Sequence, residues 1–266
     1  MIRTARRHCK ASFACGIALA AAMLLIAGSL PARAQGLRFG FEPAARFAAS
    51  KAALVMTMRG EVEVGDAERL RRFIVGNRNH FIEHGGRVTF AIDGGDVLEA
   101  VRIGELLRDA LVEIWLPDAA SSRCVSACFF MFVHAPSRTA VADAVGIHRP
   151  YFDRTALVKS TPEAARERYE SLALELRARM EQLSVPIALV ERMFALPAGE
   201  VHRLTAEELS ALGRTQAWFD DYLAARCARQ SEREPGSPGS SYSQCVDEWL
   251  QGHRKDLVDR LARNSG

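Results

Sequence analysis

The chain has 266 residues, of which 48% are hydrophobic and 25% are charged. This is the composition of an ordinary globular protein, so disorder, collagen and a coiled coil are excluded as descriptions of the whole chain. The formal net charge is +3. It would favour an anionic partner only if the basic residues were clustered on one surface of the folded protein.

The first 34 residues have the pattern of a bacterial-type secretory signal peptide. Residues 1–10 contain four basic residues and no acidic one, residues 11–30 are apolar, and residues 32–34 form the small-residue cleavage motif Ala-Arg-Ala. We therefore expect cleavage near Ala34 and a periplasmic or secreted mature protein. The alternative is an uncleaved signal that anchors the protein in a membrane, since about 20 apolar residues can span a bilayer.

Removal of residues 1–34 would reverse the sign of the net charge. The mature chain would keep 30 basic and 32 acidic residues, which gives a net charge of −2. These charges are interspersed, whereas a phosphate-binding surface needs clustered Lys and Arg. We therefore expect no nucleic-acid partner.

Four cysteines would remain in the mature chain, and an oxidising compartment would favour up to two disulfides. Cys227 and Cys245 flank a segment rich in Pro, Gly and Ser, which favours a disulfide between two helices of the tail. Cys124 and Cys128 are four residues apart. They are either disulfide-bonded, which would rigidify the loop between them, or two buried thiols.

Strand and helix patterns alternate along the mature chain. After a leader at residues 35–51, the strands are expected at 52–58, 88–92, 112–116, 139–141 and 145–148. The expected helices are 66–75, 97–111, 126–134, 161–183, 186–196 and 205–212. This alternation with glycine turns predicts an α/β domain over residues 52–214, with a parallel sheet and helices on its faces. Residues 215–266 are predicted to form a helical tail.

Three segments carry candidate groups for acyl-transfer chemistry. Ser126 lies at a predicted helix N-terminus, where amide dipoles favour developing negative charge. His148 ends a predicted strand and is the candidate general base. Gly94 and Gly95 follow another strand, and without side chains their amides can approach a substrate oxygen closely. Taken singly, these residues are also explained as a helix cap, a structural histidine and a turn.

Together and in this order, the segments resemble the Clp-protease/crotonase superfamily. They are more closely similar to its exported branch of periplasmic proteins, which resemble the Clp protease proteolytic subunit. The resemblance covers roughly residues 53–213 and includes the segments IDGGDVLEAVRIGELLR, CxSAC and GIHRP. It implies a ClpP/crotonase-like spiral of parallel strands with flanking helices. It also implies a protruding long helix at 161–183, a candidate surface for homo-oligomer formation unless its apolar stripe belongs to the core.

The resemblance also assigns roles to individual residues. Ser126 would be the nucleophile, His148 the general base and then acid, and the amides of Gly94 or Gly95 and Ala127 the oxyanion hole. The implied protein is an exported serine hydrolase, an ATP-independent peptidase acting on peptides or unfolded protein segments. No ATPase partner is expected, because the cell envelope offers no ATP. The alternative is a non-catalytic binding or assembly module with the same fold.

The sequence departs from the family pattern at two places. The family loop usually has Ser and Pro between its Asn or Asp and the glycine pair, whereas Asp93 here precedes Gly94 directly. The acid of the family's triad corresponds to Val201. Glu200 is the best substitute for it, and Asp153, five residues after His148, is a local alternative.

Other chemistries have less support in the sequence. A Ser/Lys mechanism needs a buried lysine near the serine, and Lys51 and Lys159 lie outside any motif. An acyl-CoA enzyme is disfavoured because an exported protein would meet little CoA. His80 and His84 lack an acidic or cysteine partner at ligand spacing, so we expect no metal site and no cofactor.

Overall fold

The structure is a computed structural model that describes residues 36–47, 54–151, 160–197, 199–231 and 238–264. The predicted signal peptide, Lys51, Asp153 and Lys159 lie outside the described residues. The chain divides into two units, residues 1–35 and 36–266, and the described residues all belong to the second. None of the helices described is both long enough and apolar enough to cross a membrane.

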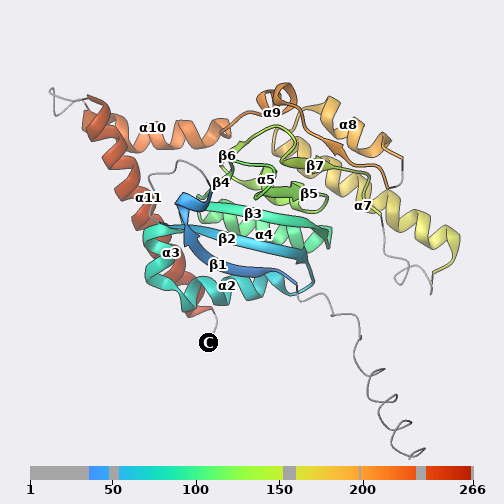
Figure 1. Ribbon diagram of the computed structural model, residues 1–266, viewed down its shortest axis with the longest axis horizontal. Coiled ribbons are helices and arrows are strands. Elements are labelled where there is room, and N and C mark those ends of the chain that lie inside the picture. Colours follow the sequence, from blue (N-terminus) through green and yellow to red (C-terminus); the bar gives the residue numbers. More distant parts are fainter. Residues whose placement is uncertain (1–35, 48–53, 152–159, 198, 232–237, 265–266) are drawn as a thin grey trace, which may run out of the picture. The chain divides into compact units, whose positions relative to one another are not determined.

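Residues 36–266 form a mostly parallel sheet with flanking helices, which confirms the predicted α/β class (Figure 1). The strands are β1 (Arg38–Pro43), β2 (Leu54–Val62), β3 (Arg87–Gly95), β4 (Glu113–Leu116), β5 (Arg123–Val125), β6 (Ser137–Ala140), β7 (Val145–Ile147) and β8 (His202–Arg203). A 3-10 turn, η1 (Ala44–Phe47), follows β1. The helices are α2 (Asp66–Gly76), α3 (Arg78–His84), α4 (Val97–Asp109), α5 (Cys128–His134), α7 (Pro162–Gln182), α8 (Ile187–Ala195), α9 (Ala206–Leu212), α10 (Ala217–Ser231) and α11 (Pro238–Arg263).

The sheet branches at β3. Residues 87–88 of β3 pair with residues 113–114 of β4, whereas residues 91–92 pair with residues 123–124 of β5. One path then continues from β5 to β7 and β8, and the other continues from β4 to β6. All of these pairs are parallel except β1 with β2 and β7 with β8. The carboxyl ends of β3, β5 and β7 therefore lie next to one another at one edge of the sheet.

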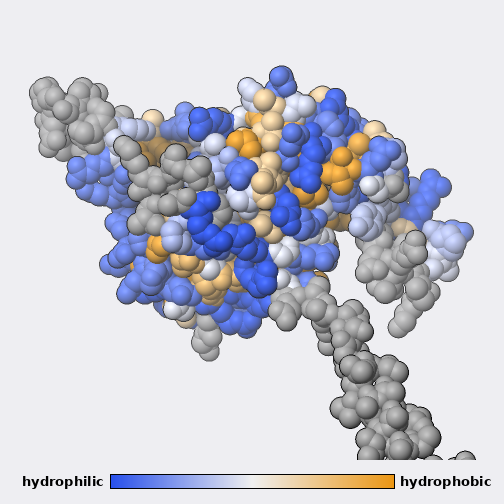
Figure 2. All heavy atoms as spheres, in the orientation of Figure 1, coloured by the Kyte–Doolittle hydropathy of each residue, from blue (hydrophilic) through white to orange (hydrophobic). Residues whose placement is uncertain are grey.

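Helices α4 and α5 cover the buried face of these strands. Every residue of α5 is buried, which explains why the segment CFFMFVH has no polar face. The one polar side chain in it, His134, places Nδ1 2.6 Å from the carbonyl oxygen of Phe130. Burial lowers the pKa of His134, so the ring is neutral and donates this hydrogen bond. Outside the core, the face of the molecule in Figure 2 is mostly hydrophilic, with apolar residues in small patches.

Three strands were not expected from the sequence, and two others extend beyond their expected ends. β1 lies within the predicted leader, and its alternating residues Phe39 and Phe41 pack on Phe73, with ring centroids 5.6 and 5.7 Å apart. The short strands β5 and β8 were not predicted, because segments of three and two residues carry no readable alternation. β2 and β3 continue beyond their predicted ends, to Val62 and Gly95, because backbone pairing between them persists that far.

The helical tail packs on the α/β domain through α11, which contacts α2 and α3. Leu257 and Val258 are buried in this contact, and the buried Arg254 donates a hydrogen bond from Nε to the carbonyl oxygen of Ile82 at 3.1 Å. The predicted disulfide between Cys227 and Cys245 is present and links α10 to α11.

A buried carboxylate fixes the turn between β2 and α2. The N-cap of α2 is Gly65, which has no side chain to cap the helix. Oε1 of Glu99, on α4, instead accepts hydrogen bonds from the N–H groups of Gly65 at 3.0 Å and Ala67 at 2.8 Å. Arg102 pairs with Oε2 at 2.8 Å. Burial alone would raise the pKa of Glu99, but these hydrogen bonds outweigh it and the pKa is lowered.

We expect Glu99→Gln to lower the free energy of unfolding by about 1–3 kcal/mol at neutral pH, because the charged acceptor is lost. Since the folded-state pKa is depressed, this contribution is present above the unfolded-state pKa and is lost as the pH falls through the folded-state pKa. The difference between the two proteins should therefore shrink on acidification. Urea unfolding at several pH values measures it. Glu175→Gln, in an exposed pair on α7, is the control and should cost less than about 0.5 kcal/mol; equal losses at both positions would contradict the account.

Candidate active site

The three candidate segments meet at the edge where β3, β5 and β7 end. Residue 92 pairs with residue 124, and residue 124 pairs with residue 145. Gly94, the next-to-last residue of β3, lies beside Ser126, which directly follows β5. His148 directly follows β7. This convergence depends on β5, because β5 pairs with β3 on one side and with β7 on the other.

Ser126 forms a sharp turn between β5 and α5. Its φ is 61°, in the left-handed region that residues other than glycine rarely adopt. This conformation costs roughly 1–2 kcal/mol and persists only where the surroundings hold it. The Ser126 N–H donates to the carbonyl oxygen of Gly146 at 2.9 Å, and its own carbonyl oxygen accepts from the Phe129 N–H at 2.9 Å. The turn leaves the serine half-buried at the start of a helix.

The two glycines at the end of β3 each permit a different close backbone contact. Gly94 has a φ of 139°, and a Cβ atom on it would lie 3.0 Å from Cβ and 3.2 Å from Oγ of Ser126. A Cβ atom on Gly95 would instead lie 2.1 Å from the carbonyl oxygen of Val62 on β2. Gly94 therefore lets the β3 backbone approach the serine, and Gly95 lets it approach β2.

The amide of Ala127 is the other candidate donor to a substrate oxygen. Ala127 is fully buried and is the N-cap residue of α5. Its N–H has no hydrogen-bond acceptor among the residues that the structure describes. An unpaired N–H at the start of a helix is a suitable donor to a developing oxyanion.

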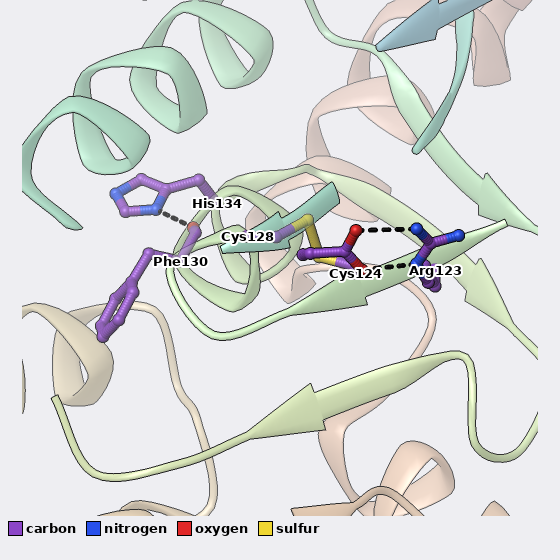
Figure 3. Close-up of a disulfide and its surroundings, with 6 residues drawn as sticks. Arg123, Cys124, Cys128, Phe130 and His134 are labelled. Atoms are coloured by element: carbon purple, nitrogen blue, oxygen red, sulfur yellow. Dashed lines mark hydrogen bonds and ion pairs between the residues drawn. A yellow bond between two sulfur atoms is a disulfide. The ribbon is translucent and has the colours of Figure 1, made fainter. Parts of the chain in front are cut away.

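Cys124 and Cys128 are joined by a disulfide, which decides between the two alternatives left open by the sequence (Figure 3). Cys124 lies on β5 and Cys128 begins α5, so the bond spans the turn that contains Ser126. The Cα atoms are 5.1 Å apart, and both side chains are fully buried. Figure 3 shows the sulfur–sulfur bond at this junction of strand and helix.

An ion pair links Asp93, near the end of β3, to Arg123, the first residue of β5. Arg123 Nη2 lies 2.7 Å from Oδ2 of Asp93, and a second contact joins Nε to Oδ1. The hydrogen bonds from Arg123 lower the pKa of Asp93. Asp93 is therefore held as an ionised carboxylate in the strand pairing. The sequence does not reveal this pair, because the two residues are 30 positions apart and β5 was not predicted.

His148 is half-buried and oriented by the neighbouring backbone. Its Nδ1 lies 2.9 Å from the carbonyl oxygen of Arg149. A carbonyl oxygen can only accept, so this contact places the proton on Nδ1 and leaves the lone pair on Nε2. The ring also stacks on Tyr151, with centroids 5.5 Å apart. Within the described chain, no hydrogen bond joins His148 to Ser126.

None of the residues considered for the triad acid is hydrogen-bonded to His148 in the part of the chain described. Glu200 is exposed, and its side chain makes no hydrogen bond or ion pair with another described residue. Asp153 lies outside the described residues. Continuing the pairing of residue 147 with residue 202 places Val201 opposite His148. The side chain at this position is therefore apolar, whereas the resemblance seen in the sequence implies a carboxylate there.

The long helix and the histidine pair singled out in the sequence are also among the described residues. The predicted long helix is α7, in which Leu176 and Met180 are buried and Leu174 is exposed. His80 and His84 lie on α3, and no group of three or more described His, Cys, Asp or Glu residues is arranged to hold a metal ion.

One cavity of about 320 Å³ is lined by Arg177, Glu181, Val185, Ile187, Val190 and Glu191. Another, of about 470 Å³, is lined by Tyr222, Arg226, Glu248, Trp249, Gly252, His253 and Asp256.

The chain was similar to known proteins in the comparison of solved structures and in neither of the other two comparisons. No family model and no curated protein matches the chain. Two solved structures that it resembles are mutants of the 1510-N membrane-bound stomatin-specific protease. A serine-to-alanine mutant has 13% identity and a TM-score of 0.40, covering 64% of this chain and 82% of that one. A lysine-to-alanine mutant in complex with a substrate peptide has 12% identity and a TM-score of 0.41, covering 60% and 71%. Similarity at this level says nothing about the function of this chain.

We expect Gly94→Ala to destabilise the protein by about 1–3 kcal/mol, because the new methyl group would crowd Ser126 at a φ that alanine rarely adopts. Gly252→Ala is the control, since Gly252 lies in α11 with no atom within 4 Å of an added Cβ, and alanine in a helix should stabilise by up to about 1 kcal/mol. Urea unfolding measures both. Wild-type stability in Gly94→Ala would show that β3 does not approach the serine this closely.

Proposed function

We propose that this protein is an exported serine hydrolase, an ATP-independent peptidase that works through an acyl-enzyme on Ser126 with His148 as the base. The observation that carries the proposal is the meeting of Gly94, Ser126 and His148 at the ends of three adjacent strands. A nucleophile on a strained strand-to-helix turn, near a histidine and with an unpaired amide at the helix start, is an arrangement suited to acyl transfer.

In the proposed reaction, His148 Nε2 takes the proton of Ser126 Oγ as Oγ attacks the carbonyl carbon of the substrate. The carbonyl oxygen becomes negative and accepts hydrogen bonds from Ala127 N–H and from the β3 backbone at Gly94 or Gly95. The protonated His148 then gives its proton to the leaving amine, which departs and leaves an ester on Ser126. Water attacks this ester with the same base and releases the acid.

The carbonyl oxygen of Arg149 takes the part of the triad acid in this proposal. It fixes the tautomer of His148 and keeps Nε2 free to accept a proton. A neutral carbonyl stabilises an imidazolium less than a carboxylate does, so the reaction would be slower than with a complete triad. Glu200 remains a candidate acid that would have to reorient when substrate binds.

Apolar side chains exposed around the site support a peptide or an unfolded segment as the substrate. Tyr151 and Val201, on the segments beside His148, are 70% and 45% exposed. Val64 follows β2 and Leu98 lies in the first turn of α4, and both are also exposed. Exposed apolar residues gathered at a candidate site suit the apolar side chains of unfolded chains.

The two disulfides support export after cleavage near Ala34, because such bonds persist in oxidising compartments. We further propose self-association through the helix predicted at 161–183, where Leu174 is 70% exposed. No ATPase, nucleic acid or cofactor takes part in the proposed reaction.

A non-catalytic binding or assembly module is the second candidate function. Two observations favour it. An apolar residue, Val201, lies opposite His148 when the β7–β8 register is continued, and in the described part of the chain Ser126 and His148 are not hydrogen-bonded to each other. Hydrogen bonds of catalytic groups are often formed only when substrate binds, so this observation does not exclude catalysis.

A fluorophosphonate probe, which phosphonylates activated serines, tests the main proposal. We expect the mature protein to be labelled and Ser126→Ala to remain unlabelled. The labelling rate of His148→Ala should be lower than that of the wild type by about 10²-fold or more. Ser137→Ala, at a serine of β6, is the control and should be labelled like the wild type. Circular dichroism checks that the variants are folded. If a control hydrolase is labelled and the folded wild type is not, the proposal is wrong and the binding module stands.

We expect Val201→Asp to raise the labelling rate by about 10-fold or more, because its carboxylate would orient His148 and stabilise the imidazolium. Val201→Asn has nearly the same shape without the charge and should leave the rate within about twofold of the wild type. Labelling time courses at the same probe concentration compare the wild type with the two variants. Equal rates for the Asp and Asn variants would show that orientation of His148 is not what limits the reaction.

A further inference from the structure

The disulfide between Cys124 and Cys128 encloses the candidate nucleophile. Ser126 is the central residue of the five-residue loop that the bond closes, with two residues on either side. Cys124 is paired within β5, and its N–H donates to the carbonyl oxygen of Ala144 at 2.8 Å. Cys128 is the first residue of α5. The bond therefore ties the strand before the serine to the helix after it.

This turn needs to be held, because Ser126 has a left-handed backbone with a φ of 61°. Two backbone hydrogen bonds, to Gly146 and from Phe129, fix its N–H and its carbonyl group. The disulfide adds a covalent constraint to these two hydrogen bonds, because it limits the distance between Cys124 and Cys128 across the turn, where their Cα atoms are 5.1 Å apart.

A small change in this turn would affect the chemistry more than the fold. The backbone of Gly94 lies directly against the Ser126 side chain, so a shift of the turn changes the position of Oγ relative to β3 and His148. Helix α5, in contrast, is buried along its whole length, and its side chains Phe129 and Phe132 are among the most fully buried of the described residues. Its packing does not depend on the conformation of one residue at its start.

The two disulfides of the protein also differ in what they restrict. Cys124 and Cys128 are 4 residues apart, and Cys227 and Cys245 are 18 apart. A bond that closes a shorter loop restricts the unfolded chain less, so it contributes less to global stability. The bond at the serine is therefore better suited to holding a local conformation than to stabilising the whole fold.

We propose that Cys124 and Cys128 are positioning residues of the active site, whose disulfide holds Ser126 in its reactive conformation, so that the reduced protein is folded but poorly active. This inference rests on the proposed function of Ser126. Formation of the bond removes two protons and two electrons from the two thiols. They pass to a disulfide oxidant such as glutathione disulfide, which becomes two thiols.

The test uses a Cys227→Ala/Cys245→Ala background, in which Cys124 and Cys128 are the only cysteines of the mature chain. Because both side chains are fully buried, the reduced form is prepared by refolding from denaturant with dithiothreitol, and the oxidised form with glutathione disulfide. Alkylation and intact mass give the redox state of each sample. Fluorophosphonate labelling is then analysed as a maximal rate and a half-saturating probe concentration.

We expect the oxidised form to be labelled like the wild type. The reduced form, and a Cys124→Ala/Cys128→Ala variant with the other disulfide intact, should show a maximal rate at least about 10-fold lower, since small displacements of reacting groups have effects of this size. The half-saturating concentration should stay within about twofold, because only positioning changes. Oxidation should restore the rate in the reduced form and not in the variant. The urea midpoint should fall more on loss of Cys227–Cys245 than on loss of Cys124–Cys128.

Two results would overturn the inference. One is a folded, fully reduced protein that is labelled at the oxidised rate. The other is a reduced protein without near-ultraviolet circular dichroism, which would show that the bond serves folding. If the wild type is never labelled, the proposed function fails, and amide hydrogen exchange tests the inference separately. Exchange at residues 125–128 should then rise on reduction while the rest of α5 and β3 stay protected, and unchanged exchange at these residues would refute the positioning role.

Discussion

The change of pairing partner along β3 is the constraint on which the rest of the structure depends. Its first residues pair with β4 and its later residues pair with β5, while β2 runs along its other side. Only because β5 replaces β4 halfway does the end of β3 lie beside Ser126. The glycine pair then lets this backbone approach both the serine and β2. Glu99 fixes the neighbouring turn through the amides of Gly65 and Ala67, so buried hydrogen bonds hold the edge in place.

The two candidate catalytic groups at this edge, Ser126 and His148, are held unequally. Ser126 is constrained by hydrogen bonds with Gly146 and Phe129 and by a disulfide around its turn. Among the described residues, His148 makes one side-chain hydrogen bond, with the neighbouring carbonyl oxygen, and its ring stacks on the exposed Tyr151. The candidate nucleophile is thus preorganised, whereas the candidate base lacks a charged partner among the described residues. The proposed enzyme would be slow for this reason, and the same imbalance gives the binding-module alternative its support.

The sequence predicts the features that depend on neighbouring residues. The helix predicted at 205–212 forms as α9, with Thr205 as its N-cap and a capping box between Thr205 and Glu208. The long helix lies within one residue of its predicted bounds. The glycine pair, the serine and the histidine were each expected at an element end, and lie there. Strand β5 and the ion pair of Asp93 with Arg123 depend on register between distant segments, which spacing in one sequence does not encode. Whether Glu200 faces the histidine depends on such register too.

The central claim is that Ser126 is an activated nucleophile. The most direct test is to locate a fluorophosphonate adduct by mass spectrometry after trypsin digestion of the reduced and alkylated protein. Cleavage after Arg123 and Arg138 releases residues 124–138, which contain two serines, Ser126 and Ser137. The account predicts one adduct per chain, with the fragment ions placing it on Ser126. An adduct on any other residue, or none in a folded protein under conditions that label a control hydrolase, would contradict it.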